Sequence, residues 1–109
     1  MKPLLVLTNL PDRETAERIS RGLIENRLAA CVNILAPCVS YYRWNNGVQK
    51  DEEYPMLIKT TESRYAELEA AIKAAHPYDL PEIIAIPIER GLPGYLSWVA
   101  EETSKGVAR

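Results

Sequence analysis

The stretch that decides the fold is ACVNILAPCVSYYRWNNGVQKDEEYPMLIKTT, residues 30–61. Two strand-like segments, residues 30–44 and 48–61, flank Asn45-Asn46-Gly47, and these turn residues adopt positive φ at little cost. The pattern predicts a long antiparallel hairpin with its loop at residues 45–47. Each arm would span roughly 45 Å at about 3.3 Å per residue, so the hairpin should extend beyond the sheet of a small domain.

The segment before the hairpin predicts a strand and a helix. Residues 4–10 carry almost no charge and end at Pro11-Asp12, which is typical of a strand buried on both faces. Asp12 can cap a helix, and acidic residues follow it early with Arg27 late. Apolar residues at helical spacing indicate one buried stripe: Ala16, Ile19, Leu23 and Ile24.

The segment after the hairpin predicts a second helix, a strand and a short helix. The second helix should begin after Thr61 or Ser63 and end near Ala75. Its apolar face has helical spacing: Tyr65, Leu68, Ile72 and Ala75. Residues 81–89 are rich in β-branched residues and predict a strand, and Gly91-Leu92-Pro93-Gly94 separates it from a final helical segment.

This order of elements predicts the fold class. A βαββαβ order is that of the α+β ferredoxin-like sandwich, in which four strands form one antiparallel sheet with both helices on one face. A chain of 109 residues suits one compact domain, so we expect residues 1–109 to form a single domain with a long protruding β-hairpin and a short C-terminal helix.

The hairpin itself predicts a bend and an assembly surface. If residues 45–47 form the loop, Pro37 lies directly opposite Pro55, and both arms should bend there because each proline removes a backbone donor. Residues 38–54 would then form a separate ribbon. It carries much apolar area: Val39, Tyr41, Tyr42, Trp44, Val48 and Tyr54. A lone ribbon exposes such area poorly, so we expect it to pack on another subunit, with packing on its own helices as the alternative.

Composition limits the partners and the compartment. A net charge of -2 without a basic tract argues against nucleic acid and anionic membranes as partners. The apolar run at residues 4–7 is too short for a signal peptide or a membrane span, so we expect a cytoplasmic protein. Cys31 and Cys38 lie seven residues apart and point to opposite faces of a regular strand, which predicts two reduced thiols that neither form a disulfide nor share a metal.

The sequence offers little catalytic chemistry. It has one histidine and lacks Gly-x-Ser-x-Gly, a phosphate-binding glycine loop and Cys-x-x-Cys, so we expect no enzyme. In the hairpin, Asp51 and Glu53 share one strand face, and Glu52 takes the other beside Lys50. This arrangement favours a solvated or ion-paired face of the ribbon over acid and base catalysis.

The stretch HPYDLPEII, residues 76–84, allows two interpretations. His76 is the best nitrogen ligand for a metal that the sequence offers, and Asp79 and Glu82 are close to it. However, a histidine after a helix also interacts favourably with the helix dipole, and the two prolines of this stretch stop a helix and start a strand. The residues alone favour the stiff turn over the metal site, and they leave both interpretations available.

Five stretches together resemble the CutA family of divalent-cation tolerance proteins: RLAACVNI (27–34), YRW with its turn (42–47), LIKTT (57–61), HPYDLPEIIAIPI (76–88) and YLSWV (95–99). The resemblance implies a ferredoxin-like cytoplasmic homotrimer, built like the trimeric nitrogen-regulatory proteins. It implies a role in tolerance of copper and other divalent cations, with no enzymatic activity and no required cofactor.

The resemblance also implies a metal site, from which this chain departs. Some copper-binding members have a cysteine in the first strand and two adjacent histidines before Pro-Tyr. Here Thr8 and Ala75 stand at two of those positions, so His76 is the only matching ligand. A single histidine predicts weak binding of Cu²⁺ or another divalent cation, unless Asp79, Glu82 or other subunits supply further ligands.

Finally, the resemblance implies clefts between subunits, with Trp44, Lys59, Tyr78 and Glu82 as their lining. Lys59 could hold an anion there, which gives a second functional hypothesis, a trimeric signalling or scaffold module that binds a small anionic ligand. The alternative is that Lys59 and Glu82 form an ion pair at the interface and that Trp44 anchors it.

Overall fold

The computed structural model describes residues 2–105, so residue 1 and residues 106–109 of the predicted 1–109 domain lie outside the described residues. The elements follow the chain as β1 (Pro3–Leu10), α1 (Arg13–Glu25), β2 (Cys31–Ile34), β3 (Cys38–Trp44), β4 (Gly47–Thr61), α2 (Glu62–Ala75), β5 (Ile83–Pro87) and α3 (Pro93–Glu102). The predicted order is confirmed, except that the first hairpin arm is divided into β2 and β3.

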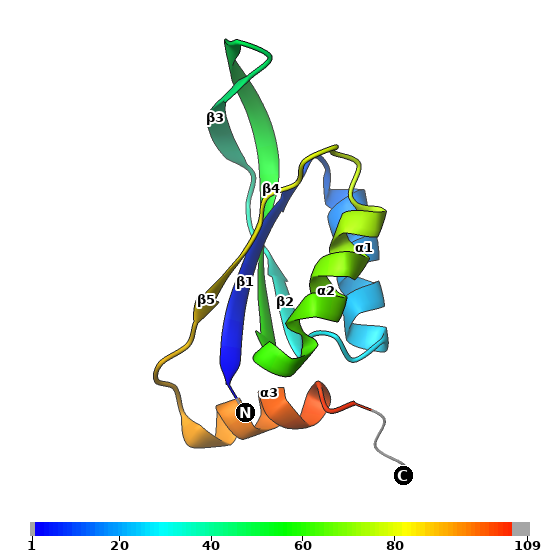
Figure 1. Cartoon of the computed structure of the whole chain (residues 1–109), viewed down its shortest axis with the longest axis vertical. Helices are drawn as coiled ribbons and strands as arrows, with labels where there is room; N and C mark the ends of the chain where they lie inside the picture. Colours follow the sequence, from blue (N-terminus) through cyan, green and yellow to red (C-terminus); the bar gives the residue numbers. More distant parts are fainter. Residues whose placement is uncertain (1, 106–109) are drawn as a thin grey trace.

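The strands form one antiparallel sheet in the order β2-β4-β1-β5, and β3 extends it by pairing with β4. α1 and α2 pack on one face of this sheet, and α3 lies across the end where β1 begins (Figure 1). Alternate residues of β1 are buried, because one face meets the helices. This is the predicted ferredoxin-like sandwich with a protruding hairpin and a C-terminal helix.

The two helices bury the stripes expected from their spacing, with two differences. The Asp12 carboxylate accepts the Thr15 amide N–H at 2.7 Å and caps α1, as predicted. Ile24 is 42% exposed, so the buried stripe of α1 is narrower than expected. In α2, the exposed Ala75 is not part of the core, whereas the charged Arg64 is buried.

The hairpin turn differs from the prediction by one residue. Trp44 pairs with Gly47, so the turn is the two-residue Asn45-Asn46, with φ of 51° and 61°. Positive φ at both central residues is the requirement of the turn that matches strand twist. The predicted loop at residues 45–47 is therefore wrong, and so is the register derived from it.

As a result, Pro37 does not face Pro55, and only one arm is interrupted. Pro37 lies in the break at residues 35–37 between β2 and β3, where the Leu35 N–H donates to the Pro55 carbonyl at 2.9 Å. β4 continues through Pro55 as a single strand, with Asn9 of β1 as the partner of Pro55. The predicted bend in both arms is replaced by a break in one.

Beyond this break, β3 and residues 47–53 of β4 form a two-stranded ribbon, which projects past the sheet (Figure 1). Tyr54 already pairs with Leu10 of β1, so the ribbon ends one residue earlier than predicted. The molecule measures 50 × 27 × 22 Å, and the ribbon accounts for its length. Tyr41, Trp44 and Val48 are 68%, 43% and 70% exposed, so the ribbon does not fold back on the helices.

The sheet face opposite α1 and α2, called the open face below, is rich in apolar side chains. Strand register and alternation place eight residues there: Leu5, Leu7, Cys31, Asn33, Leu57, Lys59, Ile84 and Ile86. Ile84 and Ile86 are each 47% exposed, although they belong to a strand. Both cysteines are free thiols, which agrees with the prediction that they do not form a disulfide.

Candidate functional site

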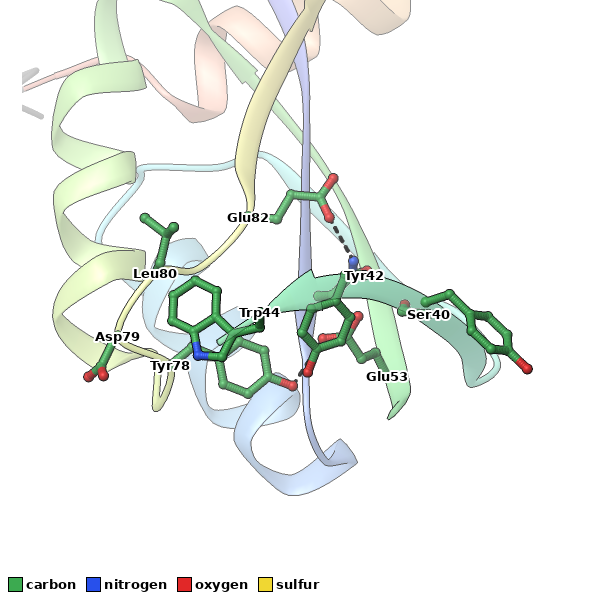
Figure 2. Close-up of a pocket in the computed structure, with 10 residues that line it drawn as sticks. Ser40, Tyr42, Trp44, Glu53, Tyr78, Asp79, Leu80 and Glu82 are labelled. Carbon is green, nitrogen blue, oxygen red and sulfur yellow. Dashed lines mark hydrogen bonds between the residues drawn. The ribbon is translucent and has the colours of Figure 1, made fainter. Parts of the chain in front are cut away.

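A cavity of about 570 Å³ lies between the ribbon and the turn that follows α2 (Figure 2). Its lining comes from β1, β3, β4 and this turn: Asn9, Ser40, Tyr41, Tyr42, Trp44, Glu53, Tyr78, Asp79, Leu80 and Glu82. The volume falls in the range of small-molecule sites, so this cavity is the candidate functional site.

Strand alternation explains how the ribbon forms one wall. Register pairs Cys38 with Glu53 and Trp44 with Gly47, and side chains two residues apart share a face. Tyr42, Trp44 and Glu53 therefore point to the same side of the ribbon. The opposite wall is the turn between Pro77 and Pro81, two residues that fix φ and keep the backbone out of a regular element.

A hydrogen bond connects the two walls. The Tyr78 hydroxyl donates to Glu53 Oε2 at 3.0 Å, and the Glu53 residue is only 8% exposed. Burial, and then this hydrogen bond to Glu53, raise the pKa of Tyr78 well above that of an ordinary tyrosine. Tyr78 is thus a neutral phenol that donates to a carboxylate at neutral pH.

Two further carboxylates accept hydrogen bonds near the cavity. Asn9 Nδ2 donates to Glu82 Oε1 at 2.9 Å, which connects β1 to the start of β5. The Tyr42 hydroxyl donates to Asp51 on the neighbouring strand, and that hydrogen bond raises the pKa of Tyr42. Both phenols therefore serve as neutral donors to carboxylates.

His76 is 7% exposed and uses both ring nitrogens inside the chain. Nδ1 accepts the Tyr78 N–H at 3.2 Å, and Nε2 lies 2.7 Å from the Asn9 carbonyl oxygen. An amide N–H requires a lone pair on Nδ1, so the proton is on Nε2, which donates to Asn9. The ring also contacts that of Tyr78, with centroids 4.7 Å apart. His76 thereby fastens the turn to β1.

This arrangement does not fit His76 as a metal ligand, because a metal at either nitrogen would have to displace a hydrogen bond. Thr8 and Ala75 stand at the two positions where the resemblance implies further metal ligands; Thr8 is buried, and Ala75 is exposed. Within residues 2–105, no three His, Cys, Asp or Glu side chains gather closely enough to hold a metal ion.

The four predicted cleft residues are only partly brought together. Trp44, Tyr78 and Glu82 line the cavity, as expected. Lys59 lies on the open face, where its ammonium donates to Asn33 and stands 4.0 Å from Cys31 Sγ. The lining in the described chain contains three carboxylates and no basic side chain, so the cavity does not favour the small anion considered from the sequence.

Sequence reasoning missed the central carboxylate. Asp51 and Glu53 do share a face opposite the exposed Glu52, but Glu53 is buried, so the expected solvated face is wrong for this residue. The signal was available, because alternation places Glu53 on the ribbon face of Tyr42 and Trp44. Asn9 and Leu80 carried no comparable signal.

The fold and the cavity define a class: a small ferredoxin-like protein whose long hairpin extends past the sheet and forms one wall of an acidic, aromatic cavity. The chain belongs to the family described as CutA1 divalent ion tolerance protein, whose profile matches residues 4–102. The resemblance found in the sequence is confirmed.

Individual relatives agree with this assignment. The chain is 46% identical over 99 residues to the divalent-cation tolerance protein CutA of Thermus thermophilus, covering 91% of this chain and 96% of that protein. The match to Mus musculus Protein CutA is 41% identical and covers 85% of this chain but 52% of that protein.

Solved structures show the same fold. A divalent cation tolerance protein from Thermus thermophilus superimposes with a TM-score of 0.91 at 44% identity, covering 94% of this chain and 99% of that chain. CutA1 from Oryza sativa superimposes with a TM-score of 0.93 at 39% identity, and the match covers 97% of this chain and 97% of that chain.

Within residues 2–105, none of the helices has the length and apolar character needed to cross a membrane.

Proposed function

We propose that this protein acts in tolerance of divalent metal cations, as a cytoplasmic homotrimer without enzymatic activity. Membership of the CutA1 divalent ion tolerance family over residues 4–102 carries the proposal. Relatives from Thermus thermophilus and Archaeoglobus fulgidus are named divalent-cation tolerance proteins. Two relatives are named for other compartments: one from Arabidopsis thaliana is named chloroplastic, and a solved structure from Archaeoglobus fulgidus is named periplasmic. The cytoplasmic part of the proposal therefore rests on the sequence of this chain alone.

Self-association has independent support in the distribution of apolar side chains. Ile84 and Ile86 of the open face are half-exposed, and Trp98 of α3 is 40% exposed. The ribbon adds Tyr41 and Val48, which are more exposed still. Apolar area of this extent is typical of a surface that another subunit covers.

The mass in solution tests the assembly. Sedimentation equilibrium of the full chain at micromolar concentration should give three times the subunit mass of 12.3 kDa. A monomer mass would contradict the homotrimer and would leave the apolar open face without an explanation.

Growth in the presence of metal tests the role. Deletion of the gene in its own host should lower the Cu²⁺ concentration that stops growth, and the wild-type gene should restore it. A deletion strain that tolerates Cu²⁺, Zn²⁺ and Co²⁺ as well as its parent does would contradict a role in tolerance.

Direct binding of Cu²⁺, if it occurs through His76, should be weak. A Cu²⁺ ion at Nε2 would displace the bond to the Asn9 carbonyl, and one at Nδ1 would displace the Tyr78 N–H. Each displacement leaves a partly buried backbone group unpaired, which costs about 1–3 kcal/mol and lowers the affinity accordingly. Binding of Cu²⁺ and the cellular role are therefore separate questions.

A further inference from the structure

The Glu53 carboxylate is buried without a positive partner. The residue is 8% exposed, and its one hydrogen bond within the described chain comes from the neutral Tyr78 hydroxyl to Oε2. None of the ion pairs formed among residues 2–105 includes Glu53. Buried carboxylates are ordinarily paired with a cation, because loss of water disfavours the charge. A positive group from outside the subunit would complete this site.

The remaining lining increases the negative potential. Asp79 and Glu82 add two carboxylates to the cavity, and among the described residues the Glu82 carboxylate accepts a hydrogen bond from the neutral Asn9 amide alone. Asp51 is close enough to Tyr78 to contribute to its raised pKa. A concave surface lined by charges of one sign concentrates ions of the opposite sign. The cavity therefore attracts cations.

Aromatic rings make up much of the rest of the cavity lining. Figure 2 shows Tyr42, Trp44 and Tyr78 around the space next to Glu53. The face of an aromatic ring attracts a cation that lies within about 6 Å of its centre. Within residues 2–105, Arg13 lies over the Tyr54 ring outside the cavity, and Lys50 lies over the ring of Tyr41, which also lines the cavity. The other three rings of the lining, Tyr42, Trp44 and Tyr78, have no such partner there.

Size and ligand chemistry distinguish an organic cation from a metal ion. A metal ion needs several converging oxygen, nitrogen or sulfur ligands, and within residues 2–105 no three His, Cys, Asp or Glu side chains gather closely enough to supply them. The space of about 570 Å³ is that of a small-molecule site. A cationic group with an apolar body uses both the carboxylates and the rings.

We propose that this cavity binds a small protonated organic amine or guanidinium compound. Its charged N–H groups lie against Glu53, and its apolar body lies among Tyr42, Trp44 and Tyr78. This binding activity is additional to metal tolerance and does not depend on it.

Calorimetric titration of the full-length protein at low ionic strength tests the ligand class. Benzylamine and phenylguanidine are the cationic probes, and benzyl alcohol and benzoate are neutral and anionic compounds of similar size. The cations should bind at least about tenfold more tightly than both controls, because only they neutralise Glu53. Their affinity should also fall as salt is added. Equal affinity for benzyl alcohol would overturn the proposal.

Two charge-removing variants locate the binding. Glu53→Gln keeps the size of the side chain and an acceptor for Tyr78, and should weaken benzylamine binding about tenfold or more. Glu52→Gln removes the same charge from the opposite, exposed ribbon face and should change affinity by less than about twofold. Equal effects of both variants would overturn the assignment to this cavity.

If Glu53→Gln does not fold, Asp79→Asn at the exposed side of the lining should weaken benzylamine binding measurably, and unchanged affinity would overturn the assignment.

A second copy of the chain is the competing source of positive charge. In that case neither cationic probe binds wild-type protein, and Glu53→Gln lowers the mass measured by sedimentation equilibrium. This pair of results would overturn the proposal, whereas loss of metal tolerance in cells would not affect it.

Discussion

At the scale of single residues, His76 shows how a side chain suited to metal chemistry can serve structure instead. Its neutral ring accepts from the Tyr78 N–H and donates to the Asn9 carbonyl, so it joins the turn after α2 to the end of β1. Asn9 in turn contacts Glu82, and Tyr78 contacts Glu53. His76 thus positions the wall formed by the turn, although it does not itself line the cavity.

We expect His76→Ala to lower the free energy of unfolding by about 1–3 kcal/mol, because two partly buried backbone groups lose their partner. Urea unfolding at fixed protein concentration measures this, and Lys73→Ala in the exposed last turn of α2 is the control. Cu²⁺ binding by the folded variant should match wild type. Loss of Cu²⁺ binding with unchanged stability would show that His76 is a metal ligand.

Tyr78 gives a prediction for alkaline pH. Burial and Glu53 raise its pKa above the 10.0 of an ordinary tyrosine, so the folded state keeps the proton at a pH where the unfolded state has lost it. Its contribution to stability is complete below pH 10 and is lost as pH rises through the folded-state pKa. Tyr78→Phe should therefore lose stability less steeply above pH 10 than wild type, as measured by urea unfolding. Identical slopes would contradict the raised pKa.

At the scale of elements, one buried charge holds the two helices in place. Arg64 of α2 donates to the carbonyls of Arg27 and Asn26 at the end of α1, and it pairs with Glu67 at 2.7 Å. Backbone N–H groups already cap the last turn of α1, with Asn26 donating to Gly22 and Leu28 to Leu23. The guanidinium instead bonds the two carbonyls that directly follow the helix. α1 and α2 are thereby fixed side by side on the sheet.

Arg64→Met should lower the free energy of unfolding by about 2–4 kcal/mol, since the Asn26 and Arg27 carbonyls and the Glu67 carboxylate lose a charged donor. Thermal and urea unfolding measure the change. Arg18→Met at an exposed position of α1 is the matched control and should shift stability by less than about 0.5 kcal/mol. Equal effects of both substitutions would contradict the role of Arg64.

The elements themselves could be predicted because each depends on local periodicity. β1, α1, α2 and the final helix follow from spacing and from breakers such as Pro11. The hairpin register could not be predicted with the same security, since it depends on whether two or three residues form the turn. The cavity depends in addition on contacts such as Tyr78 with Glu53, which lie 25 residues apart. Tyr78 and Glu82 were found through family resemblance, and Glu53 was not.

At the scale of the whole molecule, the sheet has one face covered by helices and one that remains open. The covered face contains the core, whereas the open face presents Leu5, Leu7, Leu57, Ile84 and Ile86. Isolated antiparallel sheets tolerate one solvated face when that face is polar. Here it is largely apolar, which is why we infer that subunits pack through it.

Ile84→Glu combined with Ile86→Glu should reduce the assembly to monomers, because two carboxylates would be buried without partners in the interface. Ala74→Glu on the exposed side of α2 adds charge away from the open face and should keep the wild-type mass. Light scattering coupled to gel filtration distinguishes the two. An intact trimer in the double variant would place the interface elsewhere.

The unbroken course of β4 has a mechanical consequence. One end of this strand is paired within the sheet and the other within the ribbon, whereas the opposite arm is interrupted at residues 35–37. The ribbon is therefore joined to the sheet by one continuous strand, and a change in the angle between the ribbon and the sheet twists β4. Because the ribbon carries one wall of the cavity and the sheet supports the other, the same twist sets the width of the opening. Neighbouring subunits that contact the ribbon would set the width of the cavity opening in all subunits of the assembly together.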